Sequence, residues 1–378
     1  MLMLKKTIAA LSLLSILAAC QNDENPSQPE PKPRQDINLT RAEQEFMDKG
    51  TDFAFRFFDQ VCSTEKEKPN VFVSPLSASL CLSMITNGAT DNTLAEMQDV
   101  LGFPANTFSL DDLNNYNQKL TSALLDLDNT TQLGIANSIW IEEGFKVYDS
   151  FVDVNKKMYD AQVQELDFTS PTAKDMINQW CATQTNNCIK EVIQEIPADV
   201  RMYLINALYF KGIWKSQFDK SATGQDNFTN VDGSQQKVAM MNQTATFNYT
   251  QTDDFSIAEL PYGNEAFSMV ILLPSGDKTL DESLPSLNYE NWKQWSKNMV
   301  GKELQIKLPR FKVEYDKELE EDMIAMGMKD AFDAYKAKFA NMSGAELYIG
   351  LLQQFTYINV DEDCLLYTSP SPRDRSVS

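Results

Sequence analysis

The most informative absence in this sequence of 378 residues is that of histidine, which does not occur once. Ser-His-Asp and Cys-His nucleophilic sites need an imidazole as general base, and the common catalytic zinc sites need histidine ligands. Both kinds of site are therefore excluded. Carboxylate pairs of the kind that glycosidases use remain open, because Asp and Glu together number 54.

Motifs for phosphate and nucleotide binding are missing as well. The sequence contains neither a G-x-x-x-x-G-K-[ST] loop nor a G-x-G-x-x-G turn. The formal net charge of −21 is spread along the chain, and such a charge repels the phosphates of nucleic acids. The six cysteines form no recognisable disulfide framework. We therefore expect no cofactor, no metal ion and no nucleic acid.

The N-terminus has the pattern of a lipoprotein signal. Lys5 and Lys6 precede an apolar run, Ile8–Leu17, which is too short to span a membrane. The following Leu17–Cys20 (LAAC) resembles the bacterial lipobox, in which the signal is cut before the cysteine and its sulfur is acylated. An ordinary secretory signal with a chance cysteine is the alternative. Acylation of Cys20 would anchor the protein without a spanning helix.

The composition divides the chain into four parts. We predict a lipoprotein signal peptide at 1–19, a lipid-attachment and tether segment at 20–39, a folded domain at 40–363 and a non-native tail at 364–378. Gln21–Asp36 has four prolines and no apolar residue, so we expect an extended tether that does not pack. The expected location is secreted and lipid-anchored, on the periplasmic or the cell-surface face of the outer membrane.

Strands and helices in the predicted domain come in groups rather than in alternating βαβ units. A capping box at Thr40–Glu43 begins an amphipathic helix, and Ser77–Ile85 is apolar enough for a buried helix. Gly263 and Asn264 separate two strands and predict a hairpin. The pattern predicts an α+β fold with large antiparallel or mixed sheets. Further strands are predicted at 71–73, 132–141, 161–168, 202–210, 304–315 and 347–360, and helices at 147–160, 171–185 and 318–326.

Several motifs in this region resemble those of the serpin family. Asn70–Ser77 (NVFVSPLS) is similar to the opening signature of the family, and Asn206–Trp214 (NALYFKGIW) to its most specific central motif. The resemblance implies a serpin fold with three β-sheets and eight or nine helices, here lacking the C-terminal strands. The other matching stretches are Gly88–Phe103, Leu260–Pro274 and Leu308–Phe311, in the family's order.

The resemblance implies a suicide-substrate inhibitor of proteases and not an enzyme. In the family, a protease attacks an exposed reactive loop and forms an acyl-enzyme. The cleaved loop then inserts into the main sheet as a new strand, and the dragged protease is distorted before it can be released. The implied partner is a target serine or cysteine protease. The membrane would be reached through the lipid anchor only, and we expect a monomer.

Two groups of residues match family positions that control opening of the main sheet. At the centre, the family has small hydroxyls beneath the sheet and often a histidine where this sequence has Gln354. At the top, Glu362 and Asp363 match the start of the reactive-loop hinge, and an ion pair between Arg310 and Glu362 is predicted. Ordinary polar satisfaction in a core and solvated surface charges are the plainer alternatives. The central group is Ser74, Ser77, Asn206 and Gln354, and the upper group is Trp214, Arg310 and Glu362.

The sequence departs from the family after Asp363. The family continues with small residues that let the loop slip between two strands. Cys364–Ser378 is instead rich in Ser, Pro and Arg and resembles translated sequencing adapter, with a genuine disordered tail as the alternative. We therefore expect the reactive loop and the last strands to be absent and neighbouring strands to have open apolar edges. A chain of this form is predicted to fold poorly and to inhibit nothing.

Three functions are left for the complete protein. The first is an inhibitory serpin, which small hinge residues would favour. The second is a non-inhibitory, serpin-fold surface lipoprotein that acts as a binding protein, which bulky or charged hinge residues or proline would favour. The third, a carboxylate-based hydrolase, would need a convergent acidic pair in a pocket, and the sequence has no motif for one.

Overall fold

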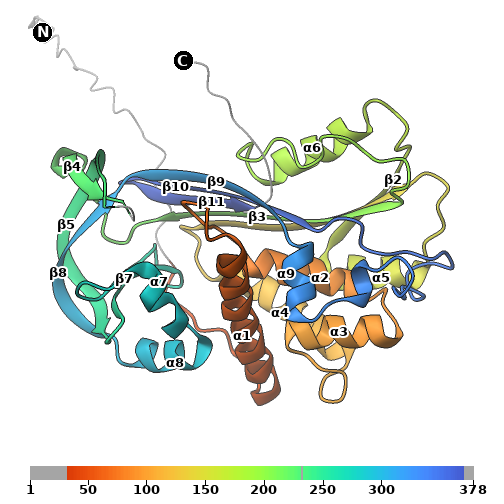
Figure 1. Ribbon diagram of the computed structural model, residues 1–378, viewed down its shortest axis with the longest axis horizontal. Helices are drawn as coiled ribbons and strands as arrows, with labels where there is room; N and C mark the ends of the chain where they lie inside the picture. Colours follow the sequence, from red (N-terminus) through yellow and green to blue (C-terminus); the bar gives the residue numbers. More distant parts are fainter. Residues whose placement is uncertain (1–31, 231–232, 370–378) are drawn as a thin grey trace, which may run out of the picture.

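The computed structural model of the chain describes residues 32–230 and 233–369. The predicted signal peptide and Cys20 lie outside the described residues. Two sheets dominate the fold, and helices pack against both faces of the larger one (Figure 1). In this view α6 lies above the large sheet, whereas α2, α4 and α9 lie below it.

The larger sheet has six strands in the order β2-β1-β3-β11-β10-β9. The first two strands pair in parallel, and all the other neighbours pair antiparallel. Residues of this sheet face a large apolar core that includes α1 and α2. The strands are β1 (Gln132–Glu142), β2 (Ala161–Leu166), β3 (Met202–Ile213), β9 (Phe311–Glu318), β10 (Gln353–Val360) and β11 (Cys364–Ser369).

The second sheet is built around one long strand, β5. Met240 of β5 pairs with β4 and with β8, and Asn248 pairs with β6 and with β8. The strand β8 therefore lies along one edge of β5, and β4 and β6 share the other edge. Because one continuous strand links them all, the described residues form two sheets and not the three that were expected. The strands are β4 (Gly224–Thr229), β5 (Gln235–Gln251), β6 (Phe255–Pro261), β7 (Ser268–Pro274) and β8 (Val300–Pro309).

Nine α-helices occur within the described residues, as the serpin resemblance implied. The helix α1 begins at the predicted capping box: the Thr40 hydroxyl accepts from the Glu43 amide, and the Glu43 carboxylate accepts from the Thr40 amide. The helix α2 is buried on most sides, as its apolar sequence predicted. The helices are α1 (Arg41–Thr64), α2 (Pro75–Thr86), α3 (Asp91–Leu101), α4 (Leu110–Asp126), α5 (Asp149–Tyr159), α6 (Ala173–Gln184), α7 (Leu280–Ser283), α8 (Tyr289–Lys297) and α9 (Glu320–Met326).

Three predicted strands are wrong in part or in whole. Residues 71–73 form no strand, and the Phe72 carbonyl accepts from the Thr356 hydroxyl. The predicted strand 304–315 is two strands in different sheets, which separate at Arg310, where the Arg310 amide donates to the Ala239 carbonyl. The last strand begins only at Gln353, since the residues before it bond to the segment around α9.

The largest difference from the sequence prediction follows Asp363. Cys364–Ser369, predicted to belong to a tail, form β11 in the middle of the main sheet. Cys364 and Leu365 are buried there. The expectation that strands after Asp363 are lacking is therefore wrong for this segment, because two neighbouring strands offer it free ladder groups. An open apolar edge of the expected kind does occur at β7, an edge strand of the second sheet, where Leu273 is 64% exposed.

Candidate functional site

The candidate site is the slot between β3 and β10 that β11 occupies in its upper part. Cys364 pairs with Ile213 at the top, and Ser369 pairs with Leu208 at the lower end of the described ladder. On the other side, β11 pairs with β10 from Val360 down to Tyr357. Both β3 and β10 extend below these pairs, so the slot is longer than the part that the described β11 fills.

Glu362 anchors the top of the slot. Glu362 is only 1% exposed, and both of its carboxylate oxygens accept from Arg310 Nε, at 2.8 and 2.7 Å. Arg310 Nη2 lies 2.6 Å from Oε1, and the Thr223 hydroxyl donates to the same oxygen. Burial alone would raise the pKa of Glu362, but the hydrogen bonds from Arg310 and Thr223 outweigh it and lower the pKa. The predicted ion pair is therefore present.

The predicted hinge start is a tight turn between β10 and β11. Asp361 Oδ1 accepts from the amides of Asp363 and Cys364, both at 3.0 Å. Trp214 Nε1 donates to the Asp361 carbonyl at 2.8 Å, and the buried indole stacks on Tyr262 with ring centroids 4.7 Å apart. These contacts fix the direction in which the chain enters the slot.

Three of the four predicted central residues lie in one hydrogen-bonded group. Gln354 Oε1 accepts from the Ser74 amide at 2.8 Å, and Gln354 Nε2 donates to the Ser74 carbonyl at 2.9 Å. The Ser74 hydroxyl in turn accepts from the Ser77 amide and caps α2. One amide side chain therefore ties β10 to the start of α2, a task that needs a donor and an acceptor.

The fourth central residue, Asn206, lies on the opposite strand of the slot. Its Nδ2 donates to Asn137 Oδ1 at 2.8 Å, while its buried Oδ1 has no hydrogen-bond partner among the described residues. The registers of β3 and β10 against β11, continued below the last pairs, place Asn206 and Gln354 at the same level. The two residues thus flank the lower slot from its two sides and do not form one cluster.

The structure adds residues that sequence reasoning missed. Asn137 of β1 partners Asn206 and also donates to the Tyr159 carbonyl at 2.7 Å. The sequence feature that could have identified Asn137 is an amide side chain within a predicted buried strand. Lys220 pairs with Asp363 at 2.6 Å, and no local pattern could identify a partner 143 residues away.

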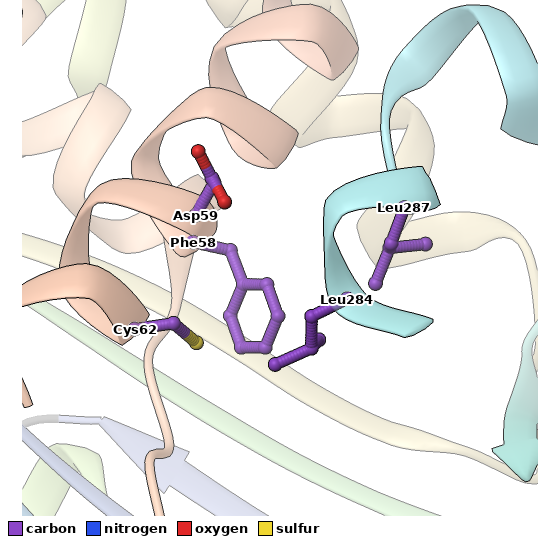
Figure 2. A pocket seen from close by; sticks show the side chains of 5 residues that line it. All are labelled: Phe58, Asp59, Cys62, Leu284 and Leu287. Atoms are coloured by element: carbon purple, nitrogen blue, oxygen red, sulfur yellow. The ribbon is translucent and has the colours of Figure 1, made fainter. Parts of the chain in front are cut away.

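A small cleft between α1 and the segment after α7 does not look like a catalytic or ligand site. It is lined by Phe58, Asp59, Cys62, Leu284 and Leu287, and it is too small to enclose a ligand (Figure 2). Burial, and secondarily the charge of Asp59, raises the pKa of the Cys62 thiol to about 11. The thiol therefore stays protonated and unreactive at neutral pH.

The described residues contain neither a metal-binding cluster nor a membrane-spanning helix. In residues 32–230 and 233–369, no three acidic or cysteine side chains gather closely enough to hold a metal ion. No helix of this part of the chain combines the length and the apolar character that a membrane span requires.

The Glu362→Gln substitution is expected to lower the free energy of unfolding by about 1–3 kcal/mol at pH 7, because it removes charge-assisted hydrogen bonds in a buried position. Since the folded-state pKa of Glu362 is lowered, its contribution is present above the unfolded value of about 4.3 and is lost as the pH falls through the folded value. Denaturant unfolding should therefore show a larger difference from the unmodified protein at pH 7 than at pH 3. Asp363→Asn, at an exposed pair, is the matched control and should change nothing measurable. Equal effects of the two substitutions would contradict the anchoring role of Glu362.

Comparisons with known proteins agree with this geometry. The sequence profile described as Serpin (serine protease inhibitor) matches residues 48–367. Serpin B6 of Macaca fascicularis is 35% identical over 305 residues, which cover 78% of this chain and 80% of that protein. An uncharacterized serpin-like protein of Methanosarcina acetivorans is 32% identical over 318 residues, 82% of this chain and 73% of that protein. The crystal structure of a thermophilic serpin, tengpin, in the latent state matches 90% of this chain and 92% of its own, with 31% identity and a TM-score of 0.79. The chain therefore belongs to the serpin family, which the matching profile describes as serine protease inhibitors.

Proposed function

We propose that the complete protein traps target serine or cysteine proteases as covalent acyl-enzymes by inserting a cleaved reactive loop between β3 and β10. One observation carries the proposal. The segment directly after β10 lies antiparallel between these two strands, with six residue pairs to β3 and four to β10. A slot that accepts a strand from this position in the chain is what the trap requires.

The proposed chemistry belongs to the protease. Its serine or cysteine attacks the carbonyl of a loop peptide bond, the amine of the next residue leaves, and an ester or thioester joins the two proteins. Hydrolysis of that bond by water would release the protease. Insertion competes with hydrolysis, because the new strand gains ladder hydrogen bonds on both edges and buries apolar side chains. The inhibitor itself needs no general base, which fits a chain without histidine.

The upper contacts supply a fixed pivot for this movement. Glu362 is held by Arg310 and Thr223, and the Asp361 carbonyl is held by Trp214. A loop that follows these residues directly would enter the slot from a fixed position. The Arg310–Glu362 pair would serve this role as a positioning contact.

We also propose that Cys20 is acylated and that the protein is held on the outer membrane. The support is the sequence pattern alone: two lysines, a short apolar run and the LAAC tetrapeptide. An acylated cysteine followed by a polar, proline-containing segment would keep the domain in water beside the lipid.

The test is an assay of the complete protein, with its reactive loop, against a panel of serine and cysteine proteases. We expect a complex that survives SDS and has the summed mass of the two proteins, and a higher midpoint of thermal unfolding after loop cleavage. A protease whose nucleophile is replaced by alanine is the control and should form no such complex. Cleavage without a complex and without a gain in thermal stability would overturn the trap and support the binding-protein alternative.

A further inference from the structure

The first described residues connect the predicted tether to one end of the domain. The Lys32 amide donates to Asn129 Oδ1 at 2.8 Å, and Lys32 Nζ lies 2.8 Å from Asp126 Oδ1. Ile37 and Leu39 are partly buried, so residues 32–39 follow the domain surface up to α1. Within the predicted tether, the exposed Lys32 meets hydrogen-bond acceptors at the end of α4 with its amide and its ammonium group.

Lys32 contacts the domain at the hinge end of the main sheet, which is the end where Asp361–Asp363 form the turn between β10 and β11. Asp128, beside Asn129, accepts from the Asn264 amide at 3.3 Å. The neighbouring Gly263 amide donates to the Ile213 carbonyl at 2.9 Å, and Ile213 pairs with Cys364. A short series of contacts therefore links the position of Lys32 to the turn that begins the hinge.

The strand registers lead to the same conclusion. Gln132, three residues after Asn129, pairs with Lys211 of β3, and Lys211 pairs with Leu366 on its other side. Gln132 and β11 are therefore two strand spacings apart, which is about 10 Å. Lys32 and the hinge share the same end of the sheet.

The distance between Lys32 and a lipid on Cys20 is limited by the length of the chain that joins them. Twelve residue steps separate Cys20 from Lys32, and a chain of that length spans at most about 40 Å. The opposite end of the sheet, near the Ile349–Ala331 hydrogen bond, has no such connection to the N-terminal segment among the described contacts. A lipid at Cys20 would therefore restrain the hinge end more closely than the opposite end.

We propose that the lipid anchor presents the hinge end of the main sheet toward the membrane, and that the target is a protease confined to the same lipid surface. This inference rests on the proposed trapping function and on acylation of Cys20. Two proteins held in a layer about 40 Å deep meet at a high effective concentration, whereas a protease free in solution does not gain this advantage. The net charge of −21 keeps the domain itself from adhering to anionic lipid, so the tether sets the spacing.

The orientation can be measured by energy transfer with the lipidated, full-length protein in vesicles of phosphatidylethanolamine and phosphatidylglycerol. A donor is placed, through an azide-bearing residue, at the exposed Gln225 near the hinge or at Tyr335, which is 95% exposed and lies toward the opposite end. Labelled lipids serve as acceptors. We expect severalfold higher transfer from position 225 than from position 335. Equal transfer, or higher transfer from position 335, would overturn the orientation.

Two variants test what causes the difference in energy transfer between positions 225 and 335: the contact of Lys32 with the domain and the lipid on Cys20. Lys32→Glu should release the tether from Asp126 and reduce the difference, because the free segment then extends back toward Thr40. Cys20→Ala should abolish vesicle binding, and a Cys20→Ala protein that stays on the vesicles would overturn the anchor. Asp36→Lys, whose partner Arg34 lies in the same segment and not in the folded domain, is the matched control and should leave the transfer unchanged.

The partner is tested by the rate of complex formation with one protease that is either soluble or anchored to the same vesicles. We expect a severalfold higher rate for the anchored protease, and loss of this advantage with Cys20→Ala. Equal rates would overturn the inference about the target. If the complete protein, with its reactive loop but without the lipid, formed no SDS-stable complex with any protease of the panel, the trapping function would be overturned, while the energy-transfer result would still decide the orientation.

Discussion

Replacing Lys317 with methionine is expected to lower the free energy of unfolding by about 3–5 kcal/mol, the cost of removing one partner from a buried ion pair. Lys317 Nζ lies 2.8 Å from Glu65 Oε1 and 3.4 Å from Asp322 Oδ2. The side chains of Lys317 and Glu65 are each 13% exposed, and that of Asp322 is not exposed at all. Without the ammonium, two buried carboxylates lose their counter-charge.

The Lys317 cluster joins three elements beneath one edge of the main sheet. Glu65 caps the end of α1, Lys317 belongs to β9, and Asp322 lies in the first turn of α9. The Thr64 hydroxyl donates to Asp322 Oδ1 at 2.8 Å. The substitution is therefore expected to loosen α1 and α9 from the sheet together.

Denaturant unfolding at pH 7 measures the expected loss. Lys336→Met removes an exposed lysine from an i,i+3 pair with Asp333 and is the matched control, with no measurable change expected. Adding Glu65→Gln and Asp322→Asn to Lys317→Met should restore part of the stability, because the unpaired charges are then removed as well. A loss no larger than that of the control, or a triple variant weaker than the single one, would contradict the charge argument.

The pH dependence of the same cluster follows from two shifts. The hydrogen bond from Lys317, together with its charge, lowers the pKa of Glu65 against the effect of burial. Burial disfavours the charge on Lys317, but the hydrogen bond to Glu65 and the charge of Asp322 outweigh it and raise its pKa. The stabilisation is therefore fully present between the unfolded-state values of about 4.3 and about 10.4, and it is lost as the pH falls through the folded-state pKa of Glu65 or rises through that of Lys317. The difference between the unmodified protein and Lys317→Met should shrink at both extremes of pH.

Replacing Gln354 with leucine is expected to lower the free energy of unfolding by about 1–3 kcal/mol, because the buried Ser74 amide loses its partner. The Ser74 carbonyl loses one of its two donors and keeps the Ala78 amide. Gln354 is 5% exposed and binds both the amide and the carbonyl of Ser74, at 2.8 and 2.9 Å. Leucine fills a similar volume but offers neither a donor nor an acceptor. The start of α2 and the strand β10 should separate more readily in the variant.

A second substitution at this position makes the hydrogen-bond argument testable by pH. Gln354→Glu keeps the size and the acceptor for the Ser74 amide, but it brings a carboxylate oxygen to the Ser74 carbonyl unless the carboxyl is protonated. The folded state should therefore raise the pKa of this glutamate, so the stability of the variant is highest below about pH 4 and falls as the pH rises. Denaturant midpoints at pH 4 and pH 7, each relative to the unmodified protein, check this. A constant difference across this range, or a Gln354→Leu variant as stable as the unmodified protein, would contradict the role of Gln354.

Local patterns predicted the elements whose formation depends on neighbouring residues. The capping box at Thr40, the apolar surface of α2 and the turn at Gly263 each act within a few residues, and all three predictions are confirmed. The Arg310–Glu362 pair was also predicted, although its partners are 52 residues apart. That prediction came from positions in family motifs and could not come from spacing alone.

The sequence by itself determined the family and the α+β class, and through the absence of histidine it excluded imidazole-based catalysis. Only the tertiary structure decided that 304–315 divides between two sheets, that Lys317 meets Glu65 across 252 residues, and that Cys364–Ser369 enters the main sheet. The physical reason is that these features depend on which strands and helices become neighbours. Hydrogen-bond partners and burial at such positions are supplied by distant segments, and a local pattern of residue types does not encode them.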